Sequence, residues 1–61
     1  MKTISEFVDL FPIAAIVRIY DKNRCVYDKC AYGIPQKYLY IGLNSFKVCF
    51  EDNRLIYKFW I

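Results

Sequence analysis

Histidine is missing from this sequence, glycine and proline occur only twice each, and no two cysteines form a C-x-x-C pair. Without histidine, the chain lacks the side chain that most often serves as a general base or metal ligand. No serine or cysteine has a visible base, and no glycine-rich phosphate loop occurs. We therefore expect a protein that is not an enzyme and that needs neither a metal nor a cofactor.

Cysteine occurs three times, at Cys25, Cys30 and Cys49. An odd number of cysteines, without an apolar signal segment after Met1, is typical of free thiols in a reducing compartment. A regular strand would place Cys25 and Cys30 on opposite faces, which disfavours a bond between them. The longest apolar run, residues 12–17, is too short to cross a bilayer. We therefore expect a location in the cytoplasm, with no membrane partner.

Basic residues exceed acidic ones only slightly, and they form no block. Nine Lys and Arg residues against six Asp and Glu residues give a net charge of +3. Dispersed charge is typical of a solvated surface, whereas nucleic-acid binding usually needs a basic stripe. The charge excludes an acidic DNA mimic and is compatible with a modest attraction to anions.

Apolar side chains are abundant for so short a chain. Hydrophobic residues make up 57% and aromatic residues 20% of the 61 residues. A domain of about 60 residues buries only ~60% of the surface that its unfolded chain exposes. Residues 1–61 therefore form one small domain with more apolar surface than its core can hide. The commonest cover for such surface is a second copy, so we expect a homo-oligomer, a dimer or larger.

The N-terminal residues predict a short helix over residues 4–10. Thr3 and Glu6 have the spacing of a capping box. Pro12 disfavours helical geometry at Phe11 and should end the helix. The apolar residues recur at the spacing of one helical face. These are Ile4, Phe7, Val8 and Phe11, with Leu10 at the edge.

Two strands should follow, at residues 14–20 and 24–32, joined by a turn at residues 21–23. Their register stays open, because a two-residue loop pairs Arg18 with Tyr27 and a three-residue loop shifts the partners by one. The longer loop favours a buried face that would comprise Val17, Ile19, Cys25 and Tyr27.

A second helix is predicted at residues 35–41, with Pro35 at its first position and Gly42 capping its end. Residues 46–61 then alternate between apolar and polar on both sides of a turn, which predicts a β-hairpin. The two hairpin turns resemble each other at an offset of thirty residues. We expect an α+β fold, helix-hairpin-short helix-hairpin, with a four-stranded antiparallel sheet. The similarity indicates either an internal duplication with pseudo-twofold symmetry or two hairpins that converged on the same turn chemistry.

Cations and aromatic residues meet on the second face of the last hairpin. A two-residue turn places Lys47 opposite Lys58, and like charges in that position destabilise a hairpin unless an anion relieves them. Trp60 beside them offers a stacking surface, and aromatic residues with cations are how proteins hold nucleotides. The candidate ligand-binding residues are Arg18, Tyr20, Arg24, Lys47, Arg54, Lys58 and Trp60.

Simpler interpretations exist for each part of this site. The lysines could splay apart on a wet face, and Trp60 could be buried between copies. Asp21 with Arg24 and Glu51 with Arg54 are expected to form exposed ion pairs at the turns. Three tyrosines and one lysine around residues 33–35 form a second candidate rim for binding a ligand or a protein. These residues are Tyr32, Tyr38, Tyr40 and Lys37.

Residues 5–12 (SEFVDLFP), residues 17–21 (VRIYD) and the closing hairpin around Asp52 and Asn53 carry a resemblance. The chain resembles short uncharacterised proteins of phages and mobile elements from low-GC Gram-positive bacteria. The resemblance is one of layout and includes no functional motif. It implies a viral protein that acts in the host cytoplasm against host defence.

The leading hypothesis is a homo-oligomer that binds and sequesters a nucleotide-derived immune signal. The alternatives are an inhibitor that binds a host defence protein directly, as anti-CRISPR proteins do, and a small nucleic-acid-binding module. Steeply salt-dependent binding of oligonucleotides would indicate the last.

Overall fold

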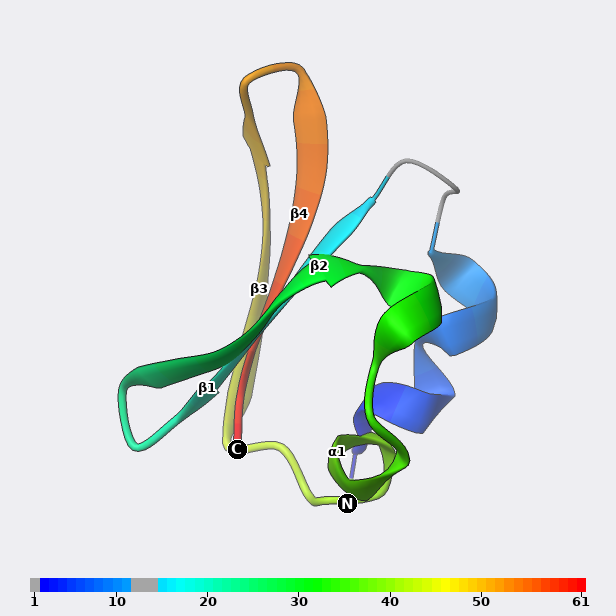
Figure 1. The fold of residues 1–61 in the computed structure, drawn as a ribbon, viewed down its shortest axis with the longest axis vertical. Coiled ribbons are helices and arrows are strands. Elements are labelled where there is room, and N and C mark those ends of the chain that lie inside the picture. Colours follow the sequence, from blue (N-terminus) through cyan, green and yellow to red (C-terminus); the bar gives the residue numbers. More distant parts are fainter. Residues whose placement is uncertain (1, 12–14) are drawn as a thin grey trace.

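The computed structural model describes residues 2–11 and 15–61, and its centre is a four-stranded sheet (Figure 1). The strands lie in the order β2-β1-β4-β3. Short helical segments precede the first hairpin and connect the two hairpins. The strands are β1 (Ile16–Asp21), β2 (Arg24–Cys30), β3 (Ser45–Glu51) and β4 (Arg54–Trp60). The helical segments are η1 (Ile4–Glu6), η2 (Val8–Leu10), η3 (Ala31–Gly33) and α1 (Gln36–Leu39).

The α+β class is confirmed, but the prediction of a purely antiparallel sheet is wrong. The two hairpins are antiparallel, whereas the central strands β1 and β4 run parallel. Each hairpin contributes its most apolar strand to the centre. β1 is the first strand of its hairpin and β4 is the second strand of its own, so the two meet in the same direction. The tips of the hairpins consequently point toward opposite ends of the sheet (Figure 1).

The same strand order argues against an internal duplication with twofold symmetry. Such symmetry would superimpose β1 on β3 and would place these two strands in equivalent positions. In the sheet, β1 is central and β3 lies at an edge. The similar turn sequences are therefore explained by the local conformation that both turns need.

Both turns place two residues in the left-handed region. Lys22 and Asn23 have φ values of 52° and 68°, and Asp52 and Asn53 have values of 52° and 63°. Positive φ at both central residues defines the type I′ turn, whose twist matches that of the flanking strands. Two-residue loops are therefore present in both hairpins.

The register of the first hairpin contains a bulge that the sequence did not reveal. Asp21 pairs with Arg24 and Tyr20 with Cys25, but Ile19 pairs with Tyr27, so Val26 is the extra residue. Arg18 consequently lies opposite Asp28 and not opposite Tyr27. The bulge also reverses the alternation along the strand.

Because of this bulge, Cys25 and Cys30 share a face, contrary to the expectation for a regular strand. Cys25 pairs with Tyr20 and Cys30 with Ile16, and these two β1 residues point to the same side. The cysteines of the chain are free.

The first segment forms two short 3₁₀ turns, η1 and η2, where a continuous helix over residues 4–10 was predicted. Phe7 separates them, with φ −100° and ψ −12°. The capping interaction is present, since the Thr3 backbone N–H donates to Glu6 Oε2 at 2.7 Å. Phe11 is extended, as expected before Pro12, which itself lies outside the described residues together with residue 14 of the predicted strand.

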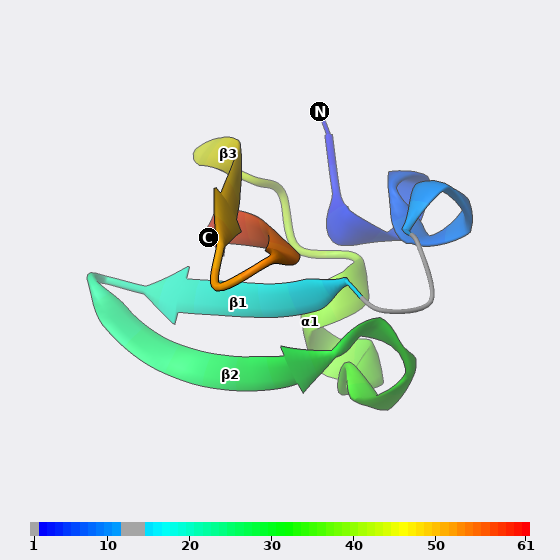
Figure 2. The same cartoon turned by 90° about the horizontal axis from the view of Figure 1, so that it is seen from above.

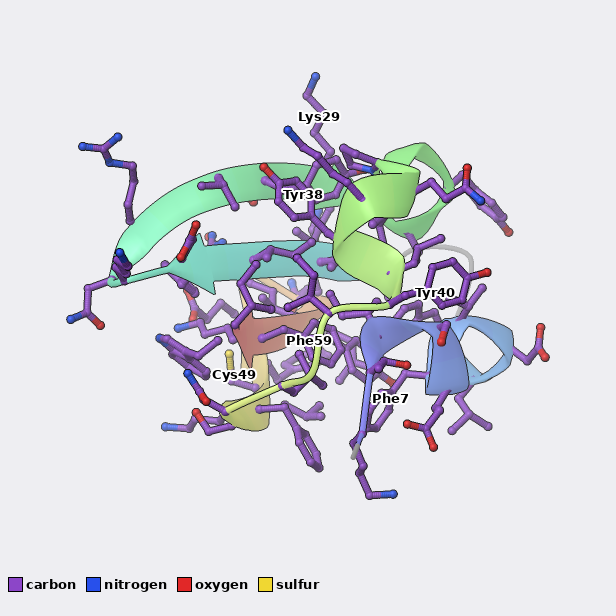
Figure 3. All side chains as sticks on the ribbon, turned by 90° about the horizontal axis from the view of Figure 1, so that it is seen from below. Phe7, Lys29, Tyr38, Tyr40, Cys49 and Phe59 are labelled. Atoms are coloured by element: carbon purple, nitrogen blue, oxygen red, sulfur yellow. The ribbon has the colours of Figure 1, made fainter. Side chains whose placement is uncertain are left out.

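The bend lets this segment direct two phenylalanines at the sheet. The centroid of the Phe7 ring lies 5.4 Å from that of the Phe59 ring (Figure 3). The centroids of the Phe11 and Tyr57 rings lie 4.6 Å apart. A straight helix would have turned Val8 inward, but Val8 is 40% exposed. The contacts of Phe7 and Phe11 with aromatic rings of the sheet therefore stabilise the bent segment more than a regular helix would.

The core lies between the sheet and the helical segments. Phe59, Ile4, Val17 and Ile19 are fully buried in it. We call this side of the sheet the core face. Further side chains pack around these four, among them Ile34, Tyr38, Leu39 and Leu43 from the segment that connects the hairpins.

The segment between the hairpins is less regular than expected. α1 is a single turn, Pro35 precedes it as the N-cap, and Tyr40 ends it. Gly42 does not have a positive φ, so it is not the left-handed cap that was predicted. It instead forms an isolated bridge with Thr3, which ties the segment to the N-terminal turn. Among the described residues, no helix is long and apolar enough to span a membrane.

Candidate functional site

The side of the sheet opposite the helical segments, which we call the open face, carries the polar and aromatic candidates. On β1 these are Arg18 and Tyr20, and on β4 they are Lys58 and Trp60. The parallel register places Arg18 directly beside Lys58 and Tyr20 directly beside Trp60. The sequence could not reveal this adjacency, because it depends on the parallel pairing of strands from different hairpins.

A charged row crosses all four strands. Asp28 of β2 lies opposite Arg18, which lies beside Lys58, which in turn lies opposite Lys47 of β3. Arg18 Nε donates to Asp28 Oδ1 at 3.2 Å, and this hydrogen bond is the main cause that raises the pKa of Arg18. The predicted opposition of Lys47 and Lys58 is confirmed.

Glu51, at the end of β3, supplies the anion that these cations need. Its Oε2 lies 3.4 Å from Lys58 Nζ, and its Oε1 lies 3.9 Å from a terminal nitrogen of Arg18. The thiol of Cys49 also donates to Glu51 Oε2, at 3.4 Å. The hydrogen bond from Cys49, followed by that from Lys58, lowers the pKa of Glu51. The repulsion between the lysines is thus relieved in part from within the chain.

Lys47 is the cation of the row that stays available. Arg18 and Lys58 both have carboxylate partners, but within residues 2–11 and 15–61 no carboxylate lies within 4 Å of the Lys47 ammonium. Lys47 is exposed. Within a single copy of the chain, an incoming anion would therefore meet Lys47 without first displacing one of these carboxylates.

The aromatic pair forms the next row along the open face. The rings of Tyr20 and Trp60 stack with centroids 5.2 Å apart and planes within 15° of parallel. The pair has small neighbours on the outer strands, since Tyr20 pairs with Cys25 and Trp60 pairs with Ser45. Both aromatic residues are half-buried, and their direct cross-strand partners on the outer strands are small side chains.

A hollow of about 480 Å³ lies on the other side of the charged row, near the tip of the second hairpin. Arg18 and Arg54 line it together with three carboxylates, so it is not a basic pocket. Ile56 at its base is only 4% exposed. The other lining residues are Ile16, Asp28, Glu51 and Asp52.

The structure brings together six of the seven candidates on the open face and separates the seventh. Arg54 lies in the hollow beyond Arg18. Arg24 lies beside the first turn, where it lines a different hollow with Asp21, Lys22 and Val26. The two guanidinium groups of the turns are therefore not equivalent parts of one site.

The ion pairs expected at the turns do not form in the part of the chain that the structure describes. Asp21 and Arg24 are cross-strand partners, as are Glu51 and Arg54, but their charged groups lie more than 4 Å apart. Glu51 turns instead toward Lys58, because two cations there offer more attraction than one exposed arginine.

The second candidate rim is divided. The Tyr38 ring packs against the core and receives the Lys37 ammonium over its face, 5.1 Å from the centroid. Tyr32 and Tyr40 are exposed, at 77% and 66%. The four residues therefore do not form a common pocket wall.

Comparison with known proteins does not indicate a function for this chain, so a function has to be inferred from the open face. No protein-family model matches the chain. No curated protein and no solved structure gives a significant match either.

Proposed function

We propose that this chain is a non-enzymatic binding protein that sequesters a nucleotide-derived signalling molecule on the open face of its sheet. The observation that carries this proposal is the parallel register of β1 and β4, which places the Tyr20–Trp60 stack directly beside Arg18 and Lys58. Aromatic faces beside cations suit a ligand that combines a base with phosphates.

The arrangement assigns a role to each row. A base would stack on the outer side of Trp60, above Ser45. Its phosphate would reach Lys47 first and then Lys58, which would exchange part of its attraction to Glu51 for the new anion. Charge-assisted hydrogen bonds to phosphate are stronger than neutral ones, so these contacts would fix the orientation of the ligand.

The biological context of the proposal is counter-defence. The resemblance in layout to small phage proteins supports a role in removing a host immune signal from the cytoplasm. Sequestration needs tight binding, and aromatic faces beside cations supply binding contacts for both a base and a phosphate.

The test is a titration with ATP, a cyclic dinucleotide and a cyclic trinucleotide, followed by the fluorescence of Trp60, which is the only tryptophan of the chain. Native mass spectrometry of protein purified from cells would weigh any ligand that stays bound. Binding should quench Trp60, and Lys47→Ala and Lys58→Ala should weaken it roughly tenfold each.

Lys29→Ala is the matched control, because Lys29 extends away from the fold on β2 (Figure 3). It should bind like the unchanged protein. The proposal would be wrong if none of the three nucleotides quenched Trp60, or if the Lys47 and Lys58 variants bound as well as the control.

A second candidate is direct inhibition of a host defence protein. It is favoured by apolar side chains away from the open face, where Leu10 is 68% exposed and Tyr32 and Tyr40 are exposed to a similar degree. Large exposed side chains of this kind are enriched at protein interfaces. A stable complex with one host protein, unaffected by nucleotides and lost in Leu10→Arg, would select this function.

A further inference from the structure

β3 is an edge strand with a regular and apolar outer border. It pairs with β4 without a bulge from Ser45 to Glu51. Within residues 2–11 and 15–61, no other strand pairs with it. Its core-face side chains are poorly covered, with Phe46 and Val48 each 47% exposed and Phe50 66% exposed. Native proteins usually protect such an edge, because it is a template for pairing with another chain.

The backbone groups at this border follow from the turn. The two-residue turn makes Glu51 and Arg54 a hydrogen-bonded pair. Alternation then directs the N–H and C=O groups of Cys49 and Lys47 toward β4 as well. The corresponding groups of Val48 and Phe50 point outward, where they are free to bond a further strand.

We propose that β3 pairs antiparallel with β3 of a second copy of this chain, about a twofold axis at Cys49, and thereby joins two sheets into one. In this register, Val48 of each copy exchanges backbone hydrogen bonds with Phe50 of the other. Two such pairs give about four hydrogen bonds across the axis. The interface is isologous, as in most soluble homodimers.

The side chains of β3 are self-complementary about Cys49. Lys47 lies two residues before it and Glu51 two residues after it. An antiparallel pair centred there puts Lys47 of each copy opposite Glu51 of the other, on the same face. The exposed Val48 and Phe50 side chains meet their counterparts on the other face. Charge complementarity and apolar cover thus favour the same register.

Neighbouring registers are less favourable. An axis at Lys47 would oppose the two copies of that lysine, which is destabilising. An axis at Val48 would put Lys47 opposite Cys49 and would lose the direct ion pairs. The outer edge of β2 is a poorer template, because it is bulged and curved (Figure 2) and carries Asp28 and Lys29.

This dimer rests on the proposed function in one respect, since it provides the homo-oligomer in which the ligand would be sequestered. Dimerisation itself can be measured without any ligand. In the dimer, Lys47 gains the carboxylate of Glu51 from the second copy, so a phosphate bound there would share Lys47 with that carboxylate. If dimers form and no nucleotide binds, the proposed function fails while this inference stands. If nucleotides bind to a monomer, the reverse holds.

Cysteine cross-linking tests the register. In a Cys25→Ser/Cys30→Ser variant, only Cys49 remains, and the two copies of this residue face each other in a non-hydrogen-bonded pair. The Cα atoms of such a pair lie about 4.5 Å apart, a separation that a disulfide can span. Mild oxidation should convert the protein to a covalent dimer, seen on a non-reducing gel.

The control adds Lys47→Cys and Cys49→Ser to the Cys25→Ser/Cys30→Ser variant, so that its single cysteine lies at position 47. It should cross-link poorly. Cross-linking mainly between the two proteins in an equal mixture would indicate the axis at Val48 and would overturn the proposed register.

Analytical ultracentrifugation over a series of protein concentrations measures the monomer–dimer equilibrium and tests whether β3 forms the interface. The unchanged protein should dimerise, and Phe50→Arg should abolish the dimer. Leu10→Arg is the matched control, because Leu10 is 68% exposed but lies on η2. Lys47→Glu should weaken dimerisation roughly tenfold, since it creates two like-charge pairs across the axis.

Three results would overturn the inference. The first is an unchanged protein that stays monomeric up to its solubility limit. The second is a dimer that survives Phe50→Arg, because that dimer would use another surface of the chain. A dimer lost equally in Leu10→Arg would likewise assign the interface to η2.

Discussion

Arg18 of β1 and Lys58 of β4 lie directly beside each other in the parallel pair at the centre of the sheet, and one carboxylate, that of Glu51, contacts both. Two cations are thus adjacent at the middle of the open face. Glu51 comes from β3, the outermost strand, so it ties three strands together by electrostatic attraction.

Glu51→Gln should destabilise the fold at neutral pH and change its response to acid. The pKa of Glu51 lies below its ordinary value of 4.5. A lowered pKa means that the carboxylate stabilises the folded state above about pH 4.5 and that this contribution is lost as the pH falls through the lowered pKa. The free energies of unfolding of the two proteins should therefore differ at pH 7 and converge in acid.

Urea denaturation between pH 7 and pH 2.5 measures this convergence. Asp9→Asn on η2 removes an equal charge away from the cluster and should show a smaller difference at pH 7. A constant gap between Glu51→Gln and the unchanged protein at every pH would contradict the ionic role of Glu51.

Lys47→Glu should stabilise the monomer, even though it is expected to weaken the dimer. The substitution replaces the opposed Lys47–Lys58 pair by an attractive one. Cross-strand charge pairs are worth ~0.2–1 kcal/mol. Urea denaturation at low protein concentration, where the monomer dominates, should show the gain. A loss of monomer stability would mean that Lys47 has a favourable contact within its own chain.

Gly33→Ala should destabilise the protein through Tyr27. A Cβ atom at position 33 would lie 2.8 Å from the Tyr27 hydroxyl oxygen. That hydroxyl donates to the carbonyl oxygen of Cys30 and cannot move without losing the bond. The cost should be ~0.5–1.5 kcal/mol, the usual contribution of one hydrogen bond.

Tyr27→Phe is the control background for Gly33→Ala. Alone it should lower the free energy of unfolding by a similar amount, but it removes the hydroxyl oxygen that the new methyl group at position 33 would contact. Gly33→Ala should then have almost no further effect on the melting temperature. Full additivity of the two substitutions would show that they do not act through this contact.

Asn53 should tolerate glycine but not valine. Its φ of 63° lies in the left-handed region, where a β-branched side chain is strained by ~1–2 kcal/mol. Asn53→Gly should be neutral or stabilising, because Asp-Gly is a preferred type I′ turn. Thermal denaturation of both variants measures the difference. Equal melting temperatures would show that the turn conformation is not required.

Much of the local structure could be predicted, because it depends on neighbouring residues. The second hairpin, its turn at Asp52 and Asn53, and the opposition of Lys47 and Lys58 all follow from alternation and turn chemistry. The cap between Thr3 and Glu6 is similarly local. The bulge at Val26 was missed, because nothing in a strand sequence marks the residue that is left unpaired.

The candidate site was predicted as a set of residues, and its geometry was not. Six of the seven candidates lie on the open face, because candidates of one strand are an even number of positions apart and the registers of the paired strands align them. The sequence predicted Arg54 as the ion-pair partner of Glu51. Its actual partners, Lys58 and Arg18, come near Glu51 only when the chain folds.

The sequence by itself determined the hairpins, the class of fold and the excess of apolar side chains, because alternation, turn residues and composition act over short distances. Only the tertiary structure decided that β1 and β4 would be parallel neighbours. That choice buries Val17, Ile19 and Phe59 together under the helical segments. The same choice stacks Tyr20 on Trp60 and leaves β3 at the edge, so the candidate site and the free border both result from long-range packing.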